Sequence, residues 1–305
     1  MLDFKGLQCR AALFHAVRHF FRTQGFLEVD TPLRHPVLIP ESTTVPFRSG
    51  SSFLQTSPEQ CMKRLLVRGC DKIFQICSCF RAGERGSRHL EEFTMLEWYR
   101  VGGDYRDLMD DCRSLICSVV DSLKTEPRFA VSIDGSCVGN IDLAAAWQRL
   151  SVAAAFSRWG SLSLAEALRT DRFDEVISLD IEPHLGLVSP TFLCDYPAAC
   201  ASLARLKEGD PSVAERFELY INGVELANGF SELTDAEEQR RRFEKEQDKI
   251  EKSGGKRPPL PERFLADLDR LDSAAGIAFG LDRLLMLLTG AERIDQVISF
   301  APDDW

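Results

Sequence analysis

The sequence predicts an α+β fold in which helices flank an antiparallel sheet, and two stretches of the chain carry this prediction. Residues 71–80 and 92–100 are rich in strand-forming residue types and are joined by a charged loop, which indicates two paired strands. The dipeptide Asn222-Gly223 separates two further apolar runs, and it is the strongest short signal for a hairpin. The chain of 305 residues is long enough for one large domain, and we expect a single domain over 1–305.

Composition and charge are those of a soluble globular protein, with 44% hydrophobic and 28% charged residues. No apolar run is long enough to cross a membrane, and the N-terminus lacks the apolar region of a signal peptide, so we expect a cytoplasmic protein. The net charge of −10 argues against broad binding to nucleic acid. The ten cysteines are scattered without metal-ligand spacing, and we expect reduced thiols.

The N-terminal part is predicted to hold two helices and a short strand. Apolar residues at helical spacing predict a first helix over 7–24, followed directly by a glycine. The run 25–33 indicates a short strand that a proline ends. Ser57 has the position of a helix cap, and it predicts a second helix that ends near residue 69.

The middle of the chain is predicted to be mostly helical. A regular amphipathic pattern indicates a helix over 105–123. Alanine- and leucine-rich pieces at 143–150, 164–168 and 173–181 indicate short helices, and we interpret 129–211 as an inserted helical segment. A strand is expected to begin at Thr191 within that segment, and a charged, solvent-facing helix is expected over 235–253.

The loop between the first two predicted strands is strongly cationic. It contains Arg81, Arg85, Arg88 and His89, together with glycines that allow a ligand to approach the backbone closely. Arginine-rich loops of this kind suit a polyanionic ligand such as a nucleotide triphosphate. The alternative is an exposed hairpin whose charged tip is solvated.

The second hairpin places two carboxylates on one face. A two-residue turn at Asn222-Gly223 sets Glu218 opposite Ala227 and makes Glu218 and Glu225 diagonal neighbours. Two such carboxylates repel unless a cation lies between them, and Mg²⁺ is the natural candidate. The alternative is a solvated face on which each glutamate pairs with a lysine or arginine.

The end of the chain gives a third indication of a phosphate-binding site. GIAFG, residues 276–280, is expected to form a strand that runs into a helix starting near Leu281. Arg283 then lies in the first turn, where the helix dipole disfavours a cation unless it faces an anion. Glu59 lies in the first turn of the earlier helix, where capping and dipole compensation are an adequate explanation.

The order of these stretches resembles motifs 1, 2 and 3 of the class II aminoacyl-tRNA synthetases. The matching stretches are GFLEVDTP, FRAGE with HLEEFTMLEWYR, and GIAFGLDR. EFTMLEWY and ELYINGVELANGFSEL are similar to the lysine and ATP sites of the lysyl-tRNA synthetase subgroup. The resemblance covers most of the chain and thins over 129–211. It implies a class II synthetase-like catalytic domain with an antiparallel sheet.

A narrower resemblance follows from the start of the chain. Lysyl-tRNA synthetases carry an N-terminal anticodon-binding barrel, but here the first helix begins within about ten residues of Met1, so we expect no anticodon-binding domain. A free-standing domain of this kind resembles the elongation factor P–(R)-β-lysine ligases, which attach (R)-β-lysine to a lysine side chain of elongation factor P. Ala278 supports this resemblance, because lysyl-tRNA synthetases usually carry glycine there.

This resemblance implies an ATP-dependent ligase that activates (R)-β-lysine, or lysine, as an aminoacyl-adenylate and transfers it to elongation factor P. The implied cofactors are ATP and Mg²⁺, and the implied assembly is a homodimer that pairs through motif 1. Neither tRNA nor a membrane is an expected partner. Two alternatives remain open: a minimal lysyl-tRNA synthetase, and a non-catalytic paralogue that acts as an amino-acid sensor or regulatory subunit.

The resemblance also implies roles for individual residues at the phosphate end. Arg81 and Arg283 would be the catalytic residues, Arg81 at the α-phosphate and substrate carboxylate and Arg283 at the γ-phosphate. His89 would lie near Arg283, and Glu218 and Glu225 would bind Mg²⁺. The remaining ATP-binding residues would be Glu84, Gly280 and Phe93, which would stack on adenine.

The other end of the implied site would hold the substrate's amines. Strand alternation supports this in part, because Phe93, Glu97 and Tyr99 point to one face of their strand. The resemblance implies a substrate pocket formed by Glu59, Glu97, Tyr99, Asn228, Glu232 and Ala278.

The sequence departs from the family pattern at one place and poses a geometric problem at another. Motif 2 normally reads Arg-x-Glu, but Gly83 occupies the glutamate position and Glu84 follows it. Either Glu84 serves after a small loop shift, or the backbone reads the base. A regular strand also places Asn228 on the face opposite to Glu225, so we expect a bulge between Leu226 and Gly229.

Overall fold

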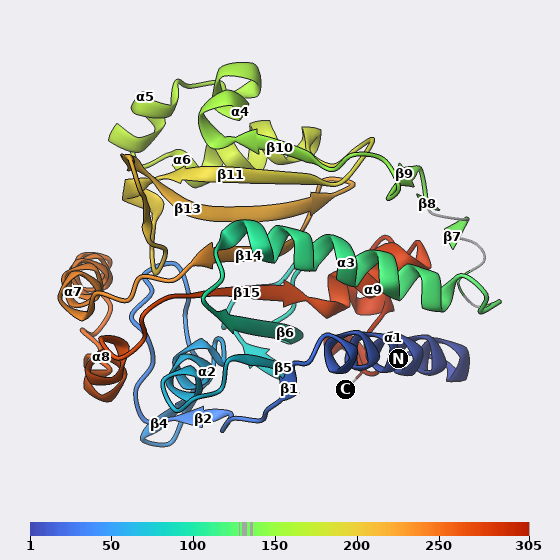
Figure 1. The fold of residues 1–305 in the computed structure, drawn as a ribbon, viewed down its shortest axis with the longest axis horizontal. Helices are drawn as coiled ribbons and strands as arrows, with labels where there is room; N and C mark the ends of the chain where they lie inside the picture. The colour runs from blue at the N-terminus through green and yellow to red at the C-terminus, as the bar shows by residue number, and fades with distance from the viewer. Residues whose placement is uncertain (128, 130–132, 135–136, 305) are drawn as a thin grey trace.

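The computed structural model describes residues 1–127, 129, 133–134 and 137–304, and a large mixed sheet organises them (Figure 1). Within these residues the sheet has nine strands, in the order β1-β5-β6-β15-β14-β13-β11-β10, with β12 paired to β13. Its strands are β1 Leu27–Glu28, β5 Lys72–Phe80, β6 Glu92–Val101, β10 Gln148–Ser151, β11 Thr191–Pro197, β12 Leu206–Lys207, β13 Asp210–Ile221, β14 Val224–Ser231 and β15 Ala274–Gly280. In the described part of the chain, only the β1–β5 and β10–β11 pairings of this sheet are parallel.

Helices and two small sheets surround this sheet. The helices are α1 Phe4–Thr23, α2 Glu59–Leu66, α3 Tyr105–Leu123, α4 Val152–Trp159, α5 Leu164–Arg169, α6 Phe173–Val176, α7 Ala236–Lys252, α8 Glu262–Leu268 and α9 Leu281–Thr289. The small sheets contain β2 Arg34–His35, β3 Arg48–Ser49 and β4 Ser52–Leu54, and β7 Ile133–Asp134, β8 Cys137–Val138 and β9 Ile141–Asp142. Among the described residues, no helix combines the length and apolar character needed to span a membrane.

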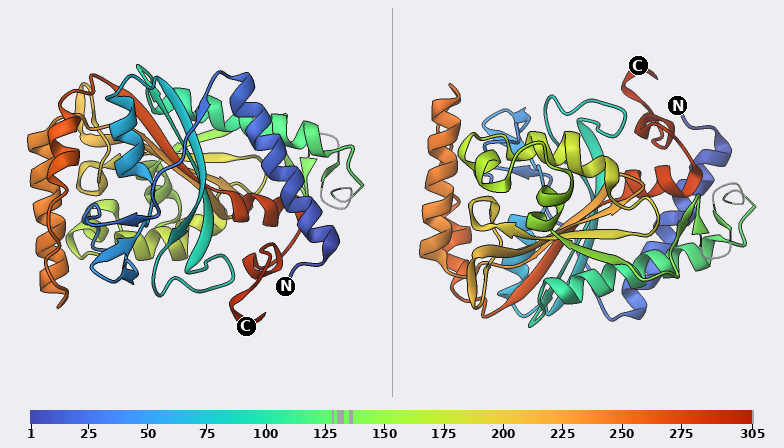
Figure 2. Two further views of the ribbon diagram at one scale, coloured as in Figure 1. Left: turned by 90° about the horizontal axis from the view of Figure 1, so that it is seen from below. Right: turned by 90° about the horizontal axis from the view of Figure 1, so that it is seen from above.

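The main hydrophobic core lies between one face of the sheet and helices α1, α3 and α9 (Figure 2). Trp98 on β6, Phe217 on β13 and Phe279 on β15 are buried on this face. Because side chains alternate along a strand, the residues next to each of these three in its own strand point to the opposite face. That second face is flanked by α2, α7 and α8 at one end and by α4–α6 at the other, and it carries the site.

The predicted elements largely match the structure. The helix expected over 105–123 has the same bounds as α3, whose N-terminus is closed by a capping box between Asp104 and Asp107. The helix expected over 7–24 begins three residues earlier, at Phe4, because the side chain of Asp3 caps it by accepting from the backbone N–H of Gly6 at 2.7 Å.

The interpretation of 129–211 as a helical insertion is only partly correct. Helices α5 and α6 lie where short helices were expected, but the helix expected over 143–150 is wrong, because 148–150 form strand β10 and α4 begins only at Val152. Strands β10 and β11 extend the main sheet, and α4–α6 pack over its end around Leu193 and Tyr220. Short strands at a sheet edge carry too few residues for an alternating pattern to stand out. Residues 130–132 and 135–136 of that segment lie outside the described residues.

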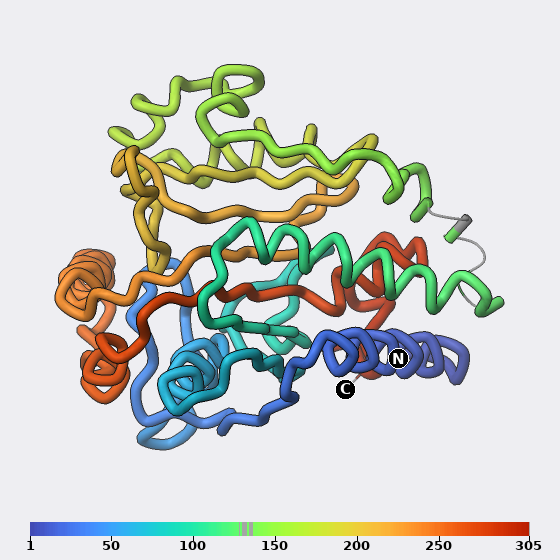
Figure 3. Tube along the Cα trace, in the orientation of Figure 1, coloured from blue at the N-terminus to red at the C-terminus, as the bar shows by residue number. Residues whose placement is uncertain are grey.

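The two ends of the chain lie side by side (Figure 3). The backbone N–H of Leu2 donates to the carbonyl of Ser299 at 3.2 Å. The amino group of Met1 forms an ion pair with Asp304 at 2.5 Å. Helix α1 is thereby attached to the segment that follows α9.

Candidate active site

A cleft of about 990 Å³ opens on the face of the sheet opposite the main core. Thirteen of the fourteen residues predicted for the site line it, and they come from α2, β6, β13, β14, β15, α9 and the loop between β5 and β6. They are Glu59, Arg81, Glu84, His89, Phe93, Glu97, Tyr99, Glu218, Glu225, Asn228, Ala278, Gly280 and Arg283. The fourteenth, Glu232, is buried behind the wall of the cleft.

One row of paired residues across the sheet forms the floor of the cleft. Glu218 pairs with Asn228, Asn228 with Ala278, and Ala278 with Glu97. Cross-strand partners share a face of a sheet, so the row brings four predicted site residues together from four strands. Glu97, Glu218 and Ala278 are at least 60 residues apart along the chain, and the antiparallel pairing of their strands brings them together in this floor.

The expected bulge in β14 is present, one residue closer to the turn than predicted. Tyr220 pairs with Glu225, whereas Leu219 pairs with Ala227, so Leu226 is the extra residue. Glu218 therefore lies opposite Asn228, and the expectation that it lies opposite Ala227 is wrong. The bulge reverses the alternation, and Glu225 and Asn228 consequently face the cleft together.

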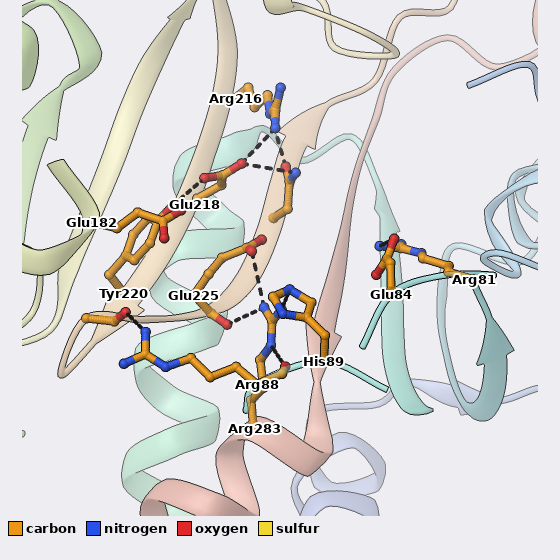
Figure 4. A network of polar contacts seen from close by, with 12 residues as sticks. Arg81, Glu84, Arg88, His89, Glu182, Arg216, Glu218, Tyr220, Glu225 and Arg283 are labelled. Atoms are coloured by element: carbon orange, nitrogen blue, oxygen red, sulfur yellow. Dashed lines mark hydrogen bonds and ion pairs between the residues drawn. The ribbon is translucent and has the colours of Figure 1, made fainter. Parts of the chain in front are cut away.

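Arg283 is held at one end of the cleft by three neighbours (Figure 4). Its Nη1 donates to the backbone carbonyl of Glu225 at 2.7 Å and to Oε2 of the same residue at 3.1 Å. Its Nη2 lies 2.8 Å from Nε2 of His89, and its Nε donates to the carbonyl of Arg88 at 3.2 Å. These contacts tie α9 to the loop between β5 and β6 and to β14.

His89 is uncharged near neutral pH in this arrangement. Burial lowers the pKa of its imidazole to about 4, and the nearby charges of Arg283, Arg81 and Arg88 add to the effect. A neutral imidazole can accept the hydrogen bond that Arg283 donates, because arginine itself has no acceptor. The positive charge at this end therefore belongs to the arginines.

Arg81 lines the cleft next to Phe93, the residue that the family resemblance implies for adenine stacking. Its guanidinium is 5.2 Å from the centre of the Phe93 ring, and its Nη1 is 3.9 Å from Glu84. Its Nε is buried and has no hydrogen-bond partner in the part of the chain that the structure describes. Arg81 is thus a cation with donor capacity still available.

Gly83 explains the departure from the motif 2 pattern. Its φ of +81° is in the left-handed region, which favours glycine and strains a glutamate. Its backbone N–H donates to Oε1 of Glu91 at 2.8 Å, and Oε2 of Glu91 pairs with Arg85. These contacts hold the loop in this conformation. Of its glutamates, Glu84 is the one that lines the cleft.

The carboxylates predicted to bind a metal have close polar neighbours. Oε1 of Glu218 accepts from Arg216 at 2.7 Å, and Oε2 accepts from the hydroxyl of Tyr220 at 2.7 Å. Burial raises the pKa of Glu218, and the charge of Glu225 raises it further. Glu182, which follows α6, extends this acidic group: burial and then Glu225 and Glu218 raise its pKa to about 7.

Glu218 and Glu225 are suited to a Mg²⁺ site whose remaining ligands would be water and substrate phosphates. Among the described residues, no group of three or more histidine, cysteine, aspartate or glutamate side chains is arranged to hold a metal ion by itself. Mg²⁺ is commonly bound by one or two carboxylates together with water and substrate phosphates. Glu218 and Glu225 fit that mode. Their charges raise the pKa of Glu182, and the charge of Glu225 raises the pKa of Glu218, so a bound cation would stabilise the ionised carboxylates.

The opposite end of the cleft is acidic and buried. Oε1 of Glu97 accepts from the hydroxyl of Ser57 at 2.5 Å, and Oε2 accepts from the hydroxyl of Tyr99 at 2.8 Å. Burial, with the charge of Glu59, raises the pKa of Glu97 to about 8. Glu232 has its pKa raised to about 8 by burial, which outweighs the opposing effect of Lys63.

Three functional neighbours were not predicted from the sequence. Lys63 lies one helical turn after Glu59 on the buried side of α2, and Arg216 lies two residues before Glu218 on the same face of β13. Both spacings were visible signals, an i,i+4 pair on a helix and an i,i+2 pair on a strand. Glu182 gave no such signal, because only the folding of 173–184 over β13 brings it to the site.

The chain belongs to the class II aminoacyl-tRNA synthetase family, whose fold class is the α+β architecture described above. The family model described as "tRNA synthetases class II (D, K and N)" matches residues 4–304. Within that class, similar curated proteins are the elongation factor P–(R)-β-lysine ligases of Salmonella typhi and Edwardsiella ictaluri. Each is 39% identical over 308 aligned residues, which cover 96% of this chain and 94% of the relative. The chain therefore belongs to the family of these ligases.

Proposed function

We propose that this protein uses ATP to activate (R)-β-lysine, or lysine, as an aminoacyl-adenylate and transfers it to a lysine side chain of elongation factor P. The observation that carries this proposal is the polarity of a single cleft. Arg81 and Arg283 line one part of the cleft, and the carboxylates of the partly buried Glu59 and the buried Glu97 line its other end. A diamino acid has its carboxylate and its two ammonium groups arranged to match this polarity.

In the proposed first step, the substrate carboxylate attacks the α-phosphorus of ATP and pyrophosphate leaves. No protein nucleophile is needed, so the protein's task is to align two anions and to stabilise charge on the phosphoryl oxygens. Arg81 would contact the α-phosphate and the carboxylate, and its free Nε is available for this. Arg283, held by Glu225 and His89, would contact the γ-phosphate.

Glu218 and Glu225 would hold Mg²⁺ beside the phosphates. The metal ion would neutralise phosphate charge and relieve the repulsion among the buried acids. Arg216 and Tyr220 fix the orientation of Glu218 through its two oxygens. Phe93 would stack on adenine, Glu84 would read its edge, and Gly280 would line the ATP site next to the side chain of Arg283.

At the other end of the cleft, Glu59, Glu97, Tyr99, Asn228 and Glu232 would surround the two ammonium groups. Buried carboxylates are costly when unpaired, so a pocket that contains several of them is suited to a dicationic ligand. Ala278, between Asn228 and Glu97, would set the shape of the floor.

We also propose a homodimer that pairs through α1 and β1. Phe4 and Leu7 on α1 and Leu27 on β1 are exposed apolar side chains. Strand β1 is a two-residue edge strand of the main sheet, and edges and apolar patches of this kind are suited to association.

Transfer of label decides between the proposed acceptor and the two alternatives. The protein is incubated with ATP and radiolabelled (R)-β-lysine or lysine, in parallel with elongation factor P and with tRNA. We expect label on elongation factor P alone. Label on tRNA alone would indicate a minimal lysyl-tRNA synthetase, and label on neither, with binding of the amino acid retained, would indicate a sensor or regulatory subunit. The presence of Arg81, Arg283, Glu218 and Glu225 in one cleft favours catalysis over sensing.

A further inference from the structure

Lys63 is a fully buried cation beside the proposed amine pocket. Its side chain is 1% exposed, and its Nζ lies 2.5 Å from Oε1 of Glu59 and 2.5 Å from Oε2 of Glu232. The rings of Phe230 and Phe264 are 5.3 and 5.9 Å from the same nitrogen, so aromatic side chains also pack around it. Burial by itself lowers the pKa of this ammonium group, but the charges of Glu232 and Glu59 outweigh it and raise the pKa. Lys63 therefore stays charged.

The two carboxylates that Lys63 joins come from different elements. Glu59 is in the first turn of α2, one helical turn before Lys63, and it lines the cleft. Glu232 follows β14, and its backbone N–H donates to the carbonyl of Ala274 at 2.9 Å. Lys63 thus connects the helix on one side of the pocket to the sheet behind it.

One oxygen of Glu232 lies directly behind Gly276 in the cleft wall. Its Oε1 is buried and has no hydrogen-bond partner within the described ranges of the chain. A Cβ on Gly276, which lines the cleft, would overlap this oxygen and the ring of Tyr99. Oε1 of Glu232 therefore lies behind the cleft wall at Gly276, where the wall has no side chain.

The charges of this cluster match a ligand with two ammonium groups. Glu59, Glu97 and Glu232 contribute three negative charges when ionised, and Lys63 contributes one positive charge. A buried site is stable when its charges are compensated, so the remaining two negative charges call for two positive charges on the ligand. Without Lys63 the same pocket would carry three uncompensated carboxylates.

We propose that Lys63 is a positioning residue that sets the charge of the amine pocket. It holds one oxygen each of Glu59 and Glu232, leaves Oε1 of Glu232 for a substrate ammonium group, and makes the pocket complementary to a diamino acid. This inference rests on the proposed function. It predicts that Lys63 acts on substrate affinity through the ionisation of its carboxylate partners, which a purely structural lysine would not do.

The test measures the affinity of the full-length protein for (R)-β-lysine and for lysine by calorimetry between pH 6 and 9. The titratable groups facing Lys63 are Glu59, Glu97, Tyr99 and Glu232, with Glu41 beside Glu59. In Lys63→Met, Glu97 and Glu232 lose a cation that lowers their pKa values. We expect affinity about tenfold weaker at pH 7, and a pH profile moved upward by about one unit, so that most of the affinity returns at pH 9.

Two further variants make the result specific. Lys63→Arg keeps the charge, and we expect it to keep the wild-type pH profile even where its affinity is reduced. Arg64→Met removes the neighbouring α2 cation, which pairs with Asp267 at 2.6 Å outside the cleft, and we expect it to change neither affinity nor profile. If Lys63→Met does not fold, Lys63→Gln, which retains hydrogen-bond donors without the charge, takes its place.

An equal loss of affinity at every pH, with no shift of the profile, would overturn this inference. Loss of the fold in both neutral variants, with Lys63→Arg still folded, would also overturn it and make Lys63 a structural residue. Wild-type binding of a diamino acid without transfer to elongation factor P would contradict the proposed function and leave the Lys63 result intact. Failure of the wild-type protein to bind either amino acid would overturn both.

Discussion

At the scale of single residues, the cleft separates two kinds of charge. Arg81 and Arg283 remain cationic while His89 between their regions is neutral, because burial and the arginines lower its pKa to about 4. At the opposite end, burial raises the pKa values of Glu97 and Glu232 to about 8. A ligand with ammonium groups would favour the ionised forms of Glu97 and Glu232, which are mostly protonated at neutral pH in the free protein.

Arg81→Ala is predicted to abolish adenylate formation without affecting the fold. Arg81 is partly exposed, and its ion pair with Glu84 is long, at 3.9 Å, so its loss costs little stability. Removing a donor that stabilises transition-state charge typically lowers the rate by about 100- to 1,000-fold. The measurement is pyrophosphate exchange together with a thermal melt, with Arg257→Ala, a surface residue paired to Asp248 and Glu251, as the control. Near-normal exchange by Arg81→Ala would show that its assignment to the α-phosphate is wrong.

Binding of the diamino acid is predicted to release protons and to tighten as the pH rises toward 8. In the free protein Glu97 has a pKa of about 8 and is mostly protonated at pH 7, whereas an ammonium ligand favours its ionised form. Proton release is read from calorimetry at pH 7 in two buffers of different ionisation enthalpy. Glu97→Gln should reduce the number of protons released; equal release in that variant would exclude Glu97 as the source.

The same raised pKa values predict how stability depends on pH. A carboxyl group whose pKa is about 8 when folded and about 4.5 when unfolded binds its proton more tightly in the folded state. Its contribution is complete below pH 4.5 and is lost as the pH rises through 8. The melting temperature of the ligand-free protein should consequently fall between pH 6 and 9, and a saturating diamino acid should reduce that fall. A melting temperature that rises over this range would contradict the burial of both groups.

At the scale of elements, the site depends on the exact pairing of β6, β15, β14 and β13. The hairpins, α3 and the final strand-helix unit could be predicted from the sequence, because their turns, caps and periodicity are local signals. The bulge was predicted from the need to bring Glu225 and Asn228 to one face, but its position at Leu226 was not. That position depends on packing, since Leu226 and Ala227 are both buried in the core, whereas Glu225 and Asn228 on either side of them line the cleft.

The burial of Lys63 and the position of Glu182 at the site could not be predicted from the sequence, because both depend on contacts between distant parts of the chain. A lysine among the apolar residues of a helix is ordinarily interpreted as a surface residue with a buried stem. Its burial here depends on Glu232, which is 169 residues away in the chain and reaches it only through the sheet. Such long-range pairs are a property of the tertiary structure.

Gly276→Ala is predicted to weaken amino-acid binding through the close approach of β15 to Tyr99 and Glu232. The added Cβ would overlap the Tyr99 ring and Oε1 of Glu232, both of which must then move. The expected result is a KM for the amino acid raised about tenfold or more, with the KM for ATP little changed, because the phosphate end lies elsewhere in the cleft. The two KM values are measured by pyrophosphate exchange. Equal changes in both would indicate a general disturbance of the sheet.

At the scale of the whole molecule, one face of the sheet is used for stability and the other for chemistry. Helices α1, α3 and α9 cover the first face, and the second remains open along the cleft. Arg10 of α1 connects the two functions, because it pairs with Asp282 at 2.6 Å and donates to Thr94 of β6 at 2.6 Å. Asp282 directly precedes Arg283, so the proposed dimer helix is joined to the phosphate end of the site.

The proposed dimer is predicted to dissociate when charge is placed on its apolar surface. The double variant Phe4→Glu/Leu7→Glu should elute with the mass of one chain, 34.3 kDa, whereas the wild-type protein should show twice that mass. Light scattering after size-exclusion chromatography measures both. Leu179→Glu, which changes an exposed apolar residue elsewhere, is the matched control. A wild-type protein with the mass of one chain would contradict the dimer.

The central claim is that this cleft activates a diamino acid with ATP, and pyrophosphate exchange tests it most directly. Labelled pyrophosphate is incorporated into ATP only when an enzyme forms and reverses an aminoacyl-adenylate. We expect exchange with (R)-β-lysine or lysine, none with norleucine, which lacks the second ammonium group, and a rate lowered by about 100- to 1,000-fold in Arg81→Ala. Exchange that is equally fast with norleucine, or exchange with no diamino acid at all, would contradict it.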